Sequence, residues 1–453
     1  MERMEKVPFI ICGRQKTEEH QVLEFGPKGE RTTIFLPRVT DEDIRQMSRT
    51  DAEALHELPI EEIIDFYSKV GKLWGSPGYD KLGELIDLTC RVTGYSREMI
   101  ELGMGQICQL LSREYLEATL QADLGDKRLL DEWIPRAESS VHCQPRGKVL
   151  HILAGNVPVV GITSILRGSL TKNVNIVKMS NRDIITPSYF AQAFHDIDPE
   201  HPVTKTTSVL YWPHTNQEMF NKIAAFSNVI CTWGGHDAVQ ETRRNAPLGA
   251  ELLEFGPRRG VQLIGREAFN ELDKTTIKAA HDLTLFDQEC SFSPQISFVE
   301  GDVNKYAESL AKSLEEENSR LPKGYGDPKF HANITNARIY SKFRGHRVHT
   351  STKTEWTIIV ADNIEDFPTH PLGRTIFMMP VKDLAESFNY IGPETQVVAI
   401  EPYAKAAGLK EQLTLNGVDR ITRLGKMGYF ALGSPQEGMY PLSRMVRWVK
   451  MRQ

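Results

Sequence analysis

The feature that most constrains the fold is a regular alternation of short apolar runs and helical patterns that begins after residue 146. A strand that alternates with a helix forms βαβ units, and such units build a mostly parallel, doubly wound sheet. A second alternation of the same kind follows. The apolar runs of the first alternation lie at 147–153, 174–179, 208–212 and 229–235, and those of the second at 261–264, 295–299, 357–360, 375–380 and 396–400. The sequence therefore predicts an α/β protein.

Length and the change of pattern along the chain suggest several domains. At 453 residues the chain exceeds the size at which a single core stops growing, so two or three domains are expected. Short strand-like runs at 8–12 and 32–37 precede a helical stretch that ends near residue 130. We place the boundaries as follows: a mostly helical N-terminal region at 1–140, a first α/β domain at 141–258, a second at 259–430 and a C-terminal tail at 431–453.

The second alternation also contains a charged segment. Helices are expected at about 273–286 and at about 303–316. The stretch at 315–326 is rich in charged and turn-forming residues, which predicts a surface excursion.

Composition limits the class of protein. Hydrophobic residues make up 40% and charged residues 25% of the chain, as in soluble globular proteins. The net charge of -6 argues against a general nucleic-acid binder. No apolar run reaches the length needed to span a bilayer. The six cysteines are scattered without metal-site spacing, so we expect reduced thiols, no metal site and a cytoplasmic location.

Cys290 is the strongest candidate for a nucleophile. It lies between a helical pattern and a strand-like run, in the segment 286–295. A thiolate is a good nucleophile, and helix N-termini and nearby donors lower the pKa of a thiol. The alternative is a small buried core residue, which is the usual role of a free cysteine. The polar neighbours Gln288 and Glu289 and a following proline favour an exposed loop between domains.

Two further residues have side chains that suit acyl chemistry. Asn156 falls in a turn between a strand and a helix, where its amide could donate to an oxyanion, although turns and caps commonly hold asparagine. Glu254 follows an apolar run and could be a general base or an ordinary strand-end carboxylate. His281 invites a Cys-His pairing with Cys290. It lies so close before Cys290 in the sequence that it falls inside the preceding helix, so we expect it to be an ordinary histidine on the surface of that helix.

Other residues suit a nucleotide. Lys178 ends a strand and precedes Ser180, so it could contact a ribose or phosphate or could simply be a solvated strand end. Gly234 and Gly235 precede a helix, where backbone could approach a pyrophosphate. The strict GxGxxG fingerprint is absent from this region.

In their order along the chain, these motifs resemble those of the aldehyde dehydrogenase superfamily and, within it, the LuxC-type acyl-CoA reductases of bacterial luminescence systems. The resemblance covers nearly the whole chain. Its most specific segments are 154–158, 164–167, 171–173, 198–204, 233–235, 255–257 and 281–293. It implies an aldehyde dehydrogenase-like fold with two Rossmann-like domains: a nucleotide-binding domain at 141–258 and a catalytic cysteine domain at 259–430.

The resemblance also implies roles for single residues. Cys290 matches the nucleophile, Asn156 the oxyanion donor and Glu254 the general base of the superfamily. Lys178 matches the lysine that contacts the adenosine ribose, and Gly234 lies where a glycine approaches the pyrophosphate. The neighbouring residues expected to bind the cofactor are Ser180, Asn181, Arg182 and Gly235.

Two departures from the superfamily pattern bear on function. Asn181 stands where NAD-dependent members often carry Glu, and Arg182 follows it, so a 2′-phosphate would be tolerated or paired and NADPH is the expected cofactor. Glu254 is retained although acyl transfer to and from coenzyme A needs no water-activating base. The sequence therefore still allows some hydrolysis of an acyl-enzyme, with Glu254 as the base.

The resemblance implies NADPH-dependent reduction of a fatty acyl-CoA, or a comparable activated acyl group, to the aldehyde through a thioester on Cys290. The alternatives are oxidation of an aldehyde to the acid, with Glu254 as general base, and a catalytically silent scaffold on the same fold. The partners implied are an acyl-CoA or acyl-protein donor, an acyl-protein synthetase and further copies of the chain. No nucleic acid is expected.

Overall fold

The structure is a computed structural model that describes residues 2–18, 20–27, 29–326 and 328–452. The chain forms two compact units. Unit 1 comprises Met1–Thr93, Ile100–Gly256 and Ala431–Gln453, and unit 2 comprises Gly94–Met99 and Pro257–Phe430. The N-terminal region, the first α/β alternation and the C-terminal tail thus share unit 1, except for a short segment that packs with unit 2.

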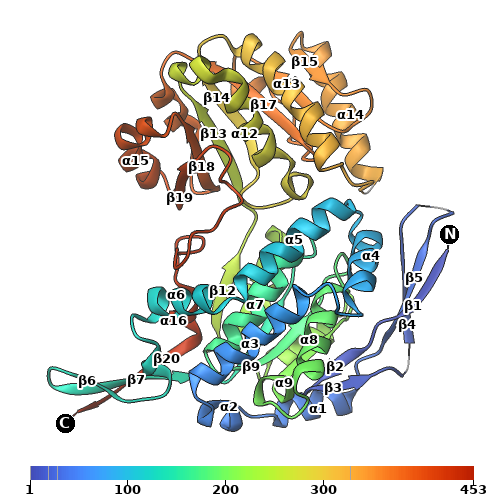
Figure 1. Cartoon of the computed structure of the whole chain (residues 1–453), viewed down its shortest axis with the longest axis vertical. Coiled ribbons are helices and arrows are strands. Elements are labelled where there is room, and N and C mark those ends of the chain that lie inside the picture. Colours follow the sequence, from blue (N-terminus) through green and yellow to red (C-terminus); the bar gives the residue numbers. More distant parts are fainter. Residues whose placement is uncertain (1, 19, 28, 327, 453) are drawn as a thin grey trace. The chain divides into compact units, whose positions relative to one another are not determined.

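Unit 1 is built on a seven-stranded sheet with the order β12-β11-β8-β9-β10-β2-β3 (Figure 1). Strands β8 to β12 are parallel to their neighbours, and β2 and β3 are antiparallel. The strands are β2 (Phe9–Ile11), β3 (Arg14–Lys16), β8 (Lys148–Ile152), β9 (Val174–Lys178), β10 (Thr207–Leu210), β11 (Val229–Trp233) and β12 (Glu251–Phe255). The chain runs from β8 outward in one direction to β10 and in the other to β12, so the order reverses between β8 and β11.

Helices cover this sheet and confirm the predicted alternation. Four of them, α7, α8, α9 and α16, have proline at the start, where its missing N–H costs no helical bond. Phe66 and Tyr67 of α3 pack edge-on against Phe194 of α8, and such aromatic pairs contribute about 0.5–1.5 kcal/mol beyond burial. The helices are α1 (Asp41–Arg49), α2 (Glu53–Glu57), α3 (Ile60–Trp74), α4 (Leu82–Thr93), α5 (Arg97–Leu110), α6 (Arg113–Leu124), α7 (Pro158–Leu170), α8 (Thr186–Ile197), α9 (Pro202–Lys205), α10 (Gln217–Ala224), α11 (His236–Asn245), α16 (Pro441–Met445) and the 3₁₀ turn η1 (Lys127–Leu130).

Two small sheets extend unit 1. The first joins β1 (Arg3–Lys6), β5 (Thr32–Pro37) and β4 (His20–Phe25). The second joins β20 (Val446–Arg452), β7 (Ser139–Pro145) and β6 (Ile134–Arg136), and forms an arm of the unit (Figure 1). The C-terminal tail therefore ends in a strand that pairs with Ser139–Pro145, across the predicted boundary between the N-terminal region and the first α/β domain.

Unit 2 holds a second seven-stranded sheet, with the order β15-β16-β17-β14-β13-β18-β19. Every pair is parallel except β15 with β16. Its strands are β13 (Arg259–Ile264), β14 (Pro294–Glu300), β15 (Arg347–Thr350), β16 (Thr357–Val360), β17 (Thr375–Val381), β18 (Thr395–Glu401) and β19 (Arg420–Arg423). Its helices are α12 (Leu272–Thr284), α13 (Val303–Arg320), α14 (Pro328–Phe343) and α15 (Ala406–Leu415), with 3₁₀ turns at η2 (Arg266–Glu271), η3 (Leu285–Gln288), η4 (Ile364–Asp366), η5 (Leu384–Tyr390) and η6 (Tyr403–Lys405).

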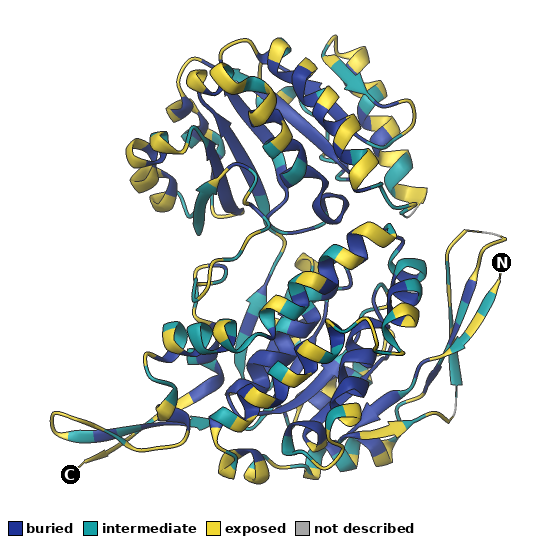
Figure 2. Ribbon diagram, viewed as in Figure 1, coloured by how far each residue is buried: buried dark blue, intermediate teal, exposed yellow. Residues whose placement is uncertain are grey.

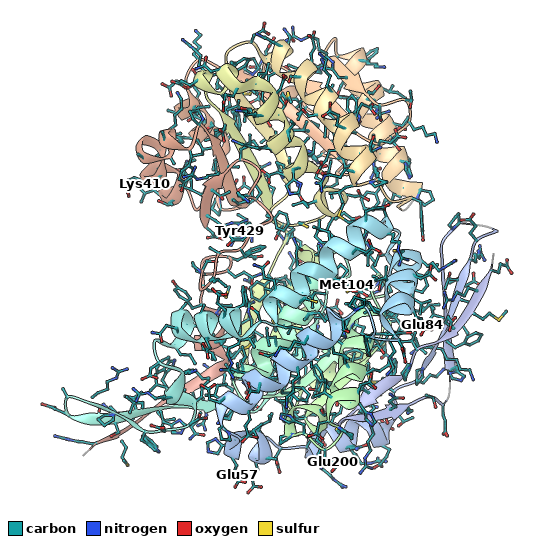
Figure 3. The ribbon with its side chains drawn as sticks, in the orientation of Figure 1. Glu57, Glu84, Met104, Glu200, Lys410 and Tyr429 are labelled. Carbon is teal, nitrogen blue, oxygen red and sulfur yellow. The ribbon has the colours of Figure 1, made fainter. Side chains whose placement is uncertain are left out.

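Burial follows the layers of each unit. The central strands are buried and the outer helix faces are exposed (Figure 2). The core on one side of the unit 2 sheet includes Phe298, Ile359 and Leu413, and burial of each such side chain stabilises the fold by about 1.5–3 kcal/mol. Charged side chains such as Glu57, Glu200 and Lys410 project outward (Figure 3).

Two boundary predictions in unit 2 are wrong. Helix α12 ends at Thr284 rather than near Phe286, which has a left-handed backbone. Helix α13 continues to Arg320, so the first half of the charged stretch at 315–326 is helical. Asp302 caps the start of α13 by accepting from two backbone N–H groups. At the end of α13, Glu315, Glu316 and Arg320 are exposed, whereas Glu317 is buried and pairs with His281 and Arg320. In the part of the chain that the structure describes, no helix is long and apolar enough to cross a membrane.

Candidate active site

In unit 1, the carboxyl ends of neighbouring parallel strands bring together predicted cofactor residues and two of the predicted catalytic residues. Asn156 follows β8, Lys178 ends β9, Gly234 follows β11 and Glu254 lies in β12, and these strands are adjacent in the sheet. The strand order reverses between β8 and β11. In open α/β sheets this reversal creates a crevice at the carboxyl edge, which is where ligands bind.

A close backbone approach joins the loop of Asn156 to the loop after β9. A Cβ added to Gly155 would lie 2.5 Å from Cβ of Arg182 and 2.7 Å from Oγ of Ser180, so this position requires glycine. Ser180 in turn accepts a hydrogen bond from the backbone N–H of Arg182 at 3.3 Å. The structure thus brings Ser180, Asn181 and Arg182 next to the turn that carries Asn156.

Lys178 lies at this edge in a partly apolar setting. Its Nζ atom is 5.8 Å from the ring centroid of Trp212, which follows β10. Burial lowers the pKa of Lys178 to about 8, against the opposing effect of Glu241. The ammonium group is therefore close to its titration range at physiological pH.

The two glycines after β11 differ in their surroundings. A Cβ on Gly234 would lie 3.1 Å from Cβ of Ala238, whereas a Cβ on Gly235 would meet no atom within 4 Å. Gly235 caps α11 with its backbone alone. The N-terminus of α11 thus leaves open space beside unpaired helical N–H groups, which suits a phosphate group.

Glu254 forms an ion pair rather than standing alone. Both its carboxylate oxygens accept hydrogen bonds from Arg243 of α11, each at 2.5 Å. The Arg243 side chain is 65% exposed, so the pair contributes at most about 1 kcal/mol. In this arrangement both oxygens of Glu254 are directed toward the guanidinium group of Arg243.

The Cys290 loop belongs to unit 2 and lies at the amino-terminal edge of its sheet, whereas the unit 1 residues lie at a carboxyl-terminal edge. It precedes β14, which starts at Pro294, so Cys290 lies near the amino ends of the parallel strands. Asn156, Lys178, Gly234 and Glu254 belong to unit 1. The structure therefore brings the four unit 1 residues to one edge and positions Cys290 within a separate unit.

The backbone before Cys290 is left-handed over three consecutive residues. Phe286, Asp287 and Gln288 have φ values of 45°, 49° and 69°, which costs about 1–2 kcal/mol for each residue with a Cβ. The Gln288 amide stabilises the turn, because Nε2 donates to the carbonyl oxygens of Pro294 at 2.6 Å and of Thr375 at 2.5 Å. Its Oε1 accepts from the N–H of Thr375 at 2.8 Å.

Cys290 itself is buried, and the expectation of an exposed loop with a lowered thiol pKa is wrong. Only 7% of the residue is exposed. Burial raises the pKa of the Cys290 thiol well above its usual value, and the charges of Glu289 and Asp287 raise it further. A hydrogen bond from Ser293 acts in the opposite direction and lowers this pKa. The Cys290 N–H donates to Ser293 Oγ at 3.2 Å, so the backbone donor beside the sulfur is already engaged.

Sequence reasoning missed the residues that surround the nucleophile. Ser293, Asp287 and Gln288 are all buried, although their polarity indicated an exposed loop. A signal was present, because three polar residues precede the cysteine and a serine follows three residues later. Arg374, which is fully buried and bonded to Asp287, gave no signal in the sequence. His281 lies within α12 as predicted, and its Nδ1 pairs with Glu317 at 3.0 Å.

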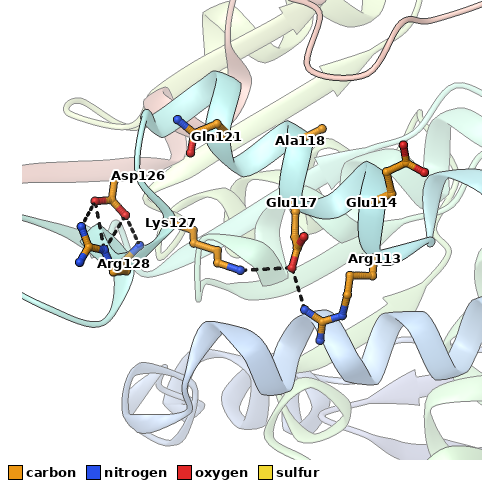
Figure 4. Close-up of a pocket in the computed structure, with 8 residues that line it drawn as sticks. All are labelled: Arg113, Glu114, Glu117, Ala118, Gln121, Asp126, Lys127 and Arg128. Carbon is orange, nitrogen blue, oxygen red and sulfur yellow. Dashed lines mark hydrogen bonds and ion pairs between the residues drawn. The ribbon is translucent and has the colours of Figure 1, made fainter.

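A hollow on the surface of unit 1 does not fit a catalytic role. Eight residues of α6 and the following turn line it, and most of them are charged (Figure 4). Arg113 and Lys127 both pair with Glu117, at 2.8 Å and 3.2 Å, and Arg128 pairs with Asp126 at 2.8 Å. The cations are neutralised by neighbouring carboxylates, so the hollow offers no free charge to an anionic ligand.

Comparison with protein families identifies similar sequences over almost the full length. The family model for acyl-CoA reductase (LuxC) matches residues 55–448. A long-chain acyl-protein thioester reductase from Aliivibrio fischeri is 34% identical over 447 residues, which cover 98% of this chain and 92% of the relative. Long-chain acyl-protein thioester reductase 2 from Photobacterium leiognathi is 32% identical over 451 residues, with 98% and 93% covered.

Solved structures share the fold at low sequence identity. Aldehyde dehydrogenase 21 from Physcomitrella patens, in complex with succinate, has a TM-score of 0.75 at 14% identity, with 99% of this chain and 98% of that chain covered. An NADP-dependent glyceraldehyde-3-phosphate dehydrogenase from Bacillus halodurans C-125, complexed with NADP, has a TM-score of 0.74 at 14% identity, with 98% of each chain covered. The fold is therefore that of the aldehyde dehydrogenases, as predicted.

Proposed function

Because the chain belongs to the LuxC family of acyl-CoA reductases, and is thus an oxidoreductase that acts on acyl groups, we propose that it reduces a fatty acyl thioester to the aldehyde with NADPH. Cys290 carries the acyl group in this proposal. The observation that supports it most is the similarity to long-chain acyl-protein thioester reductases over 98% of the chain. The acyl donor is a coenzyme A thioester or an acyl group carried by a partner protein, and an acyl-protein synthetase is the proposed source of the latter.

The first proposed step transfers the acyl group to the protein. The Cys290 sulfur attacks the thioester carbonyl and forms a new C–S bond. The bond to the donor's sulfur breaks, and the donor leaves as a thiol with the proton that Cys290 loses. Asn156 is the proposed donor to the oxyanion, an interaction that contributes roughly 3–4 kcal/mol in comparable sites.

The second proposed step releases the aldehyde. NADPH, when bound, supplies a hydride to the carbonyl carbon of the Cys290 thioester. The resulting thiohemiacetal loses the Cys290 sulfur, which regains a proton, and the aldehyde leaves. Splitting the reaction at the covalent intermediate replaces one difficult step by two easier ones.

The carboxyl edge of unit 1 fits a phosphorylated nicotinamide cofactor. Lys178 would contact the ribose, and the open space at Gly235 with the N-terminus of α11 would accept the pyrophosphate. Asn181 is exposed and Arg182 is half-buried, and no carboxylate follows Lys178 within three residues to repel a 2′-phosphate. These features support NADPH over NADH. The cytoplasm, which keeps thiols reduced, is the proposed compartment, and assembly with further copies of the chain is proposed from the resemblance alone.

The proposal is tested by replacing Cys290 with Ala. NADPH and NADH oxidation are followed across acyl-CoA chain lengths, and the acyl-enzyme is trapped and weighed by mass spectrometry. We expect Cys290→Ala to abolish both aldehyde formation and the acyl adduct. Cys143→Ala, which alters another buried thiol, serves as the matched control and should retain both. An unchanged acyl adduct and unchanged aldehyde production in Cys290→Ala would contradict the proposal.

Oxidation of an aldehyde to the acid is the second candidate, since Glu254 is retained at the general-base position. The ion pair with Arg243 counts against it, because both carboxylate oxygens are engaged. Arg243→Ala would release Glu254, so free acid should rise by up to about fivefold, and Glu254→Gln should remove the rise. Arg244→Ala, which alters the neighbouring exposed arginine, is the control. Acid as the main product of the wild-type protein would favour this second function.

A further inference from the structure

Two left-handed segments of unit 2 face each other beside Cys290. The first is Phe286, Asp287 and Gln288, and the second is Leu372, Gly373 and Arg374, with φ values of 60°, 63° and 62°. We call them the cysteine turn and the arginine turn. Only one of these six residues is glycine, so both turns are held in a conformation that L-residues disfavour.

A buried ion pair joins the two turns. Arg374 Nε donates to Asp287 Oδ1 at 2.8 Å, and the terminal NH2 group lies 2.6 Å from the same oxygen. The Arg374 side chain is fully buried, and that of Asp287 is 10% exposed. The Gln288 amide adds two hydrogen bonds, because it donates to the carbonyl oxygen of Thr375 and accepts from the N–H of the same residue. Asp287 and Gln288 of the cysteine turn thus bind Arg374 and the residue after it, the first of β17.

Both partners are also bonded to a third segment, which comprises the last turn of α13 and the residues after it. Arg374 donates to Asn318 Oδ1 at 3.0 Å and to the Leu321 carbonyl at 2.9 Å. Asp287 Oδ2 accepts from the N–H of Gly324 at 3.0 Å. Nε and Nη1 of Arg374 and both carboxylate oxygens of Asp287 therefore have hydrogen-bond partners, and such partners are what make a buried ion pair tolerable. Nη2 of Arg374 is buried and lies close to Asp287 Oδ1 but makes no hydrogen bond.

We propose that Asp287 and Arg374 are positioning residues that hold the cysteine turn and thereby set where the Cys290 sulfur lies for attack on the acyl group. The inference rests on the proposed role of Cys290. Asp287 precedes Cys290 by three residues, and the N–H of Glu289 closes the turn on the Phe286 carbonyl at 2.9 Å. The ion pair is therefore connected to Cys290 by a short piece of backbone, in which the N–H groups of Glu289 and Cys290 are hydrogen-bonded.

The primary test is Asp287→Asn, which keeps the size of the side chain and removes the charge that binds Arg374. Acylation of Cys290 is measured by mass spectrometry in single turnover with a fatty acyl-CoA, and NADPH affinity is measured by titration. We expect acylation to slow by about 100-fold, since a displacement of about 1 Å in a reacting group can have that effect. The proposed cofactor residues belong to unit 1, so NADPH affinity should stay at the wild-type value.

A pH profile separates positioning from a change of charge. The Asp287 carboxylate raises the pKa of the Cys290 thiol, so Asp287→Asn should lower the midpoint pH for alkylation by iodoacetamide. A purely electrostatic role would then make acylation at neutral pH faster. A slower acylation together with a lower midpoint supports positioning, and a faster acylation overturns it.

The control is Glu300→Gln at the other end of β14. Glu300 is as buried as Asp287 and pairs with Lys405 at 2.9 Å, and the seven residues of β14 separate it from Pro294 by about 20 Å. It should lose comparable stability and retain acylation. Equal loss of acylation in Glu300→Gln would assign the effect to general destabilisation and overturn the proposal.

A double variant covers the case in which Asp287→Asn does not fold, because that change leaves Arg374 buried and unpaired. Asp287→Asn with Arg374→Gln removes both charges, and it should fold and still acylate slowly. Acylation at the wild-type rate in a folded variant overturns the positioning role alone. Absence of any acyl adduct on wild-type Cys290 overturns the proposed function as well, so the two failures are distinguishable.

Discussion

The burial of Cys290 raises the question of how a thiol with an elevated pKa becomes a nucleophile. Its immediate charged neighbours, Glu289 and Asp287, disfavour the thiolate. The side chain of Ser293 acts in the opposite direction and lowers the thiol pKa, and its hydroxyl group also accepts a hydrogen bond from the Cys290 N–H. Ser293 is almost fully buried, so water cannot replace it. It is therefore the side chain on which thiolate formation depends most directly.

Ser293→Ala should raise the midpoint pH for alkylation of Cys290. A hydrogen bond to a charged group contributes about 1.5–3 kcal/mol, which corresponds to a shift of about 1–2 pH units. The measurement is the rate of iodoacetamide alkylation across pH, with Ser291→Ala as the control because Ser291 is a half-buried neighbour in the same loop. An unchanged midpoint in Ser293→Ala would show that the hydroxyl does not stabilise the thiolate.

Lys178 predicts a pH dependence of cofactor binding. Its pKa is lowered to about 8 by burial, so the ammonium form predominates below pH 8 and is lost as the pH rises through this value. Because the charged form attracts the cofactor, NADPH affinity should fall between about pH 7.5 and 9. Lys178→Met should bind NADPH more weakly at pH 7 and show a flat profile in that range. A wild-type affinity that does not change up to pH 9 would contradict the proposed contact.

The residues of the site differ in how far they could be predicted. Lys178, Gly234 and Asn156 follow or end apolar runs, and strand ends can be recognised from the sequence alone. Asp287 and Gln288 could not be placed, because local preference opposes a left-handed turn in residues other than glycine. The turn is stabilised by Arg374, 87 residues away in the sequence, and no local pattern records such a partner.

At the scale of elements, the helix after β11 provides a test that separates cofactor binding from stability. Gly235 has an ordinary φ of −72°, and an added Cβ would meet no protein atom. Gly235→Ala should therefore leave the melting temperature unchanged. It should weaken NADPH binding by about fivefold or more, since a methyl group added to a filled site typically costs about 1–3 kcal/mol.

The control for Gly235→Ala is Gly83→Ala in α4, which also meets no atom and should change neither property. Affinity is measured by fluorescence titration and stability by thermal melting. An unaltered NADPH affinity in Gly235→Ala would exclude the pyrophosphate from the N-terminus of α11. A lower melting temperature with unaltered affinity would point instead to a purely structural glycine.

Elements with a buried, apolar pattern were predictable, and elements defined by distant pairing were not. Strands β10 and β11 are buried along their whole length, and their continuous apolar runs identify them. Strand β20 is mostly exposed, and it pairs through Trp448 with Cys143 of β7. The partner of β20 lies about 300 residues away in the sequence, and most of its side chains face water. Such a strand has no alternation of apolar and polar residues by which it could be recognised.

At the scale of the whole molecule, the chain passes between the units four times, after Thr93, Met99, Gly256 and Phe430. Each unit nevertheless has its own seven-stranded sheet. The proposed cofactor residues belong to one unit and the proposed nucleophile to the other. Changes in side chains that share no partner are expected to act independently.

This separation predicts two opposite phenotypes. Cys290→Ala should lose the acyl adduct and bind NADPH with wild-type affinity, whereas Lys178→Met should bind NADPH weakly and still form the acyl adduct at the wild-type rate. In the double variant, the free energies of NADPH binding should add within about 0.5 kcal/mol. Titration and mass spectrometry on the four proteins provide the measurements. Loss of NADPH binding in a folded Cys290→Ala protein, or loss of acylation in Lys178→Met, would contradict the assignment of cofactor and acyl group to different units.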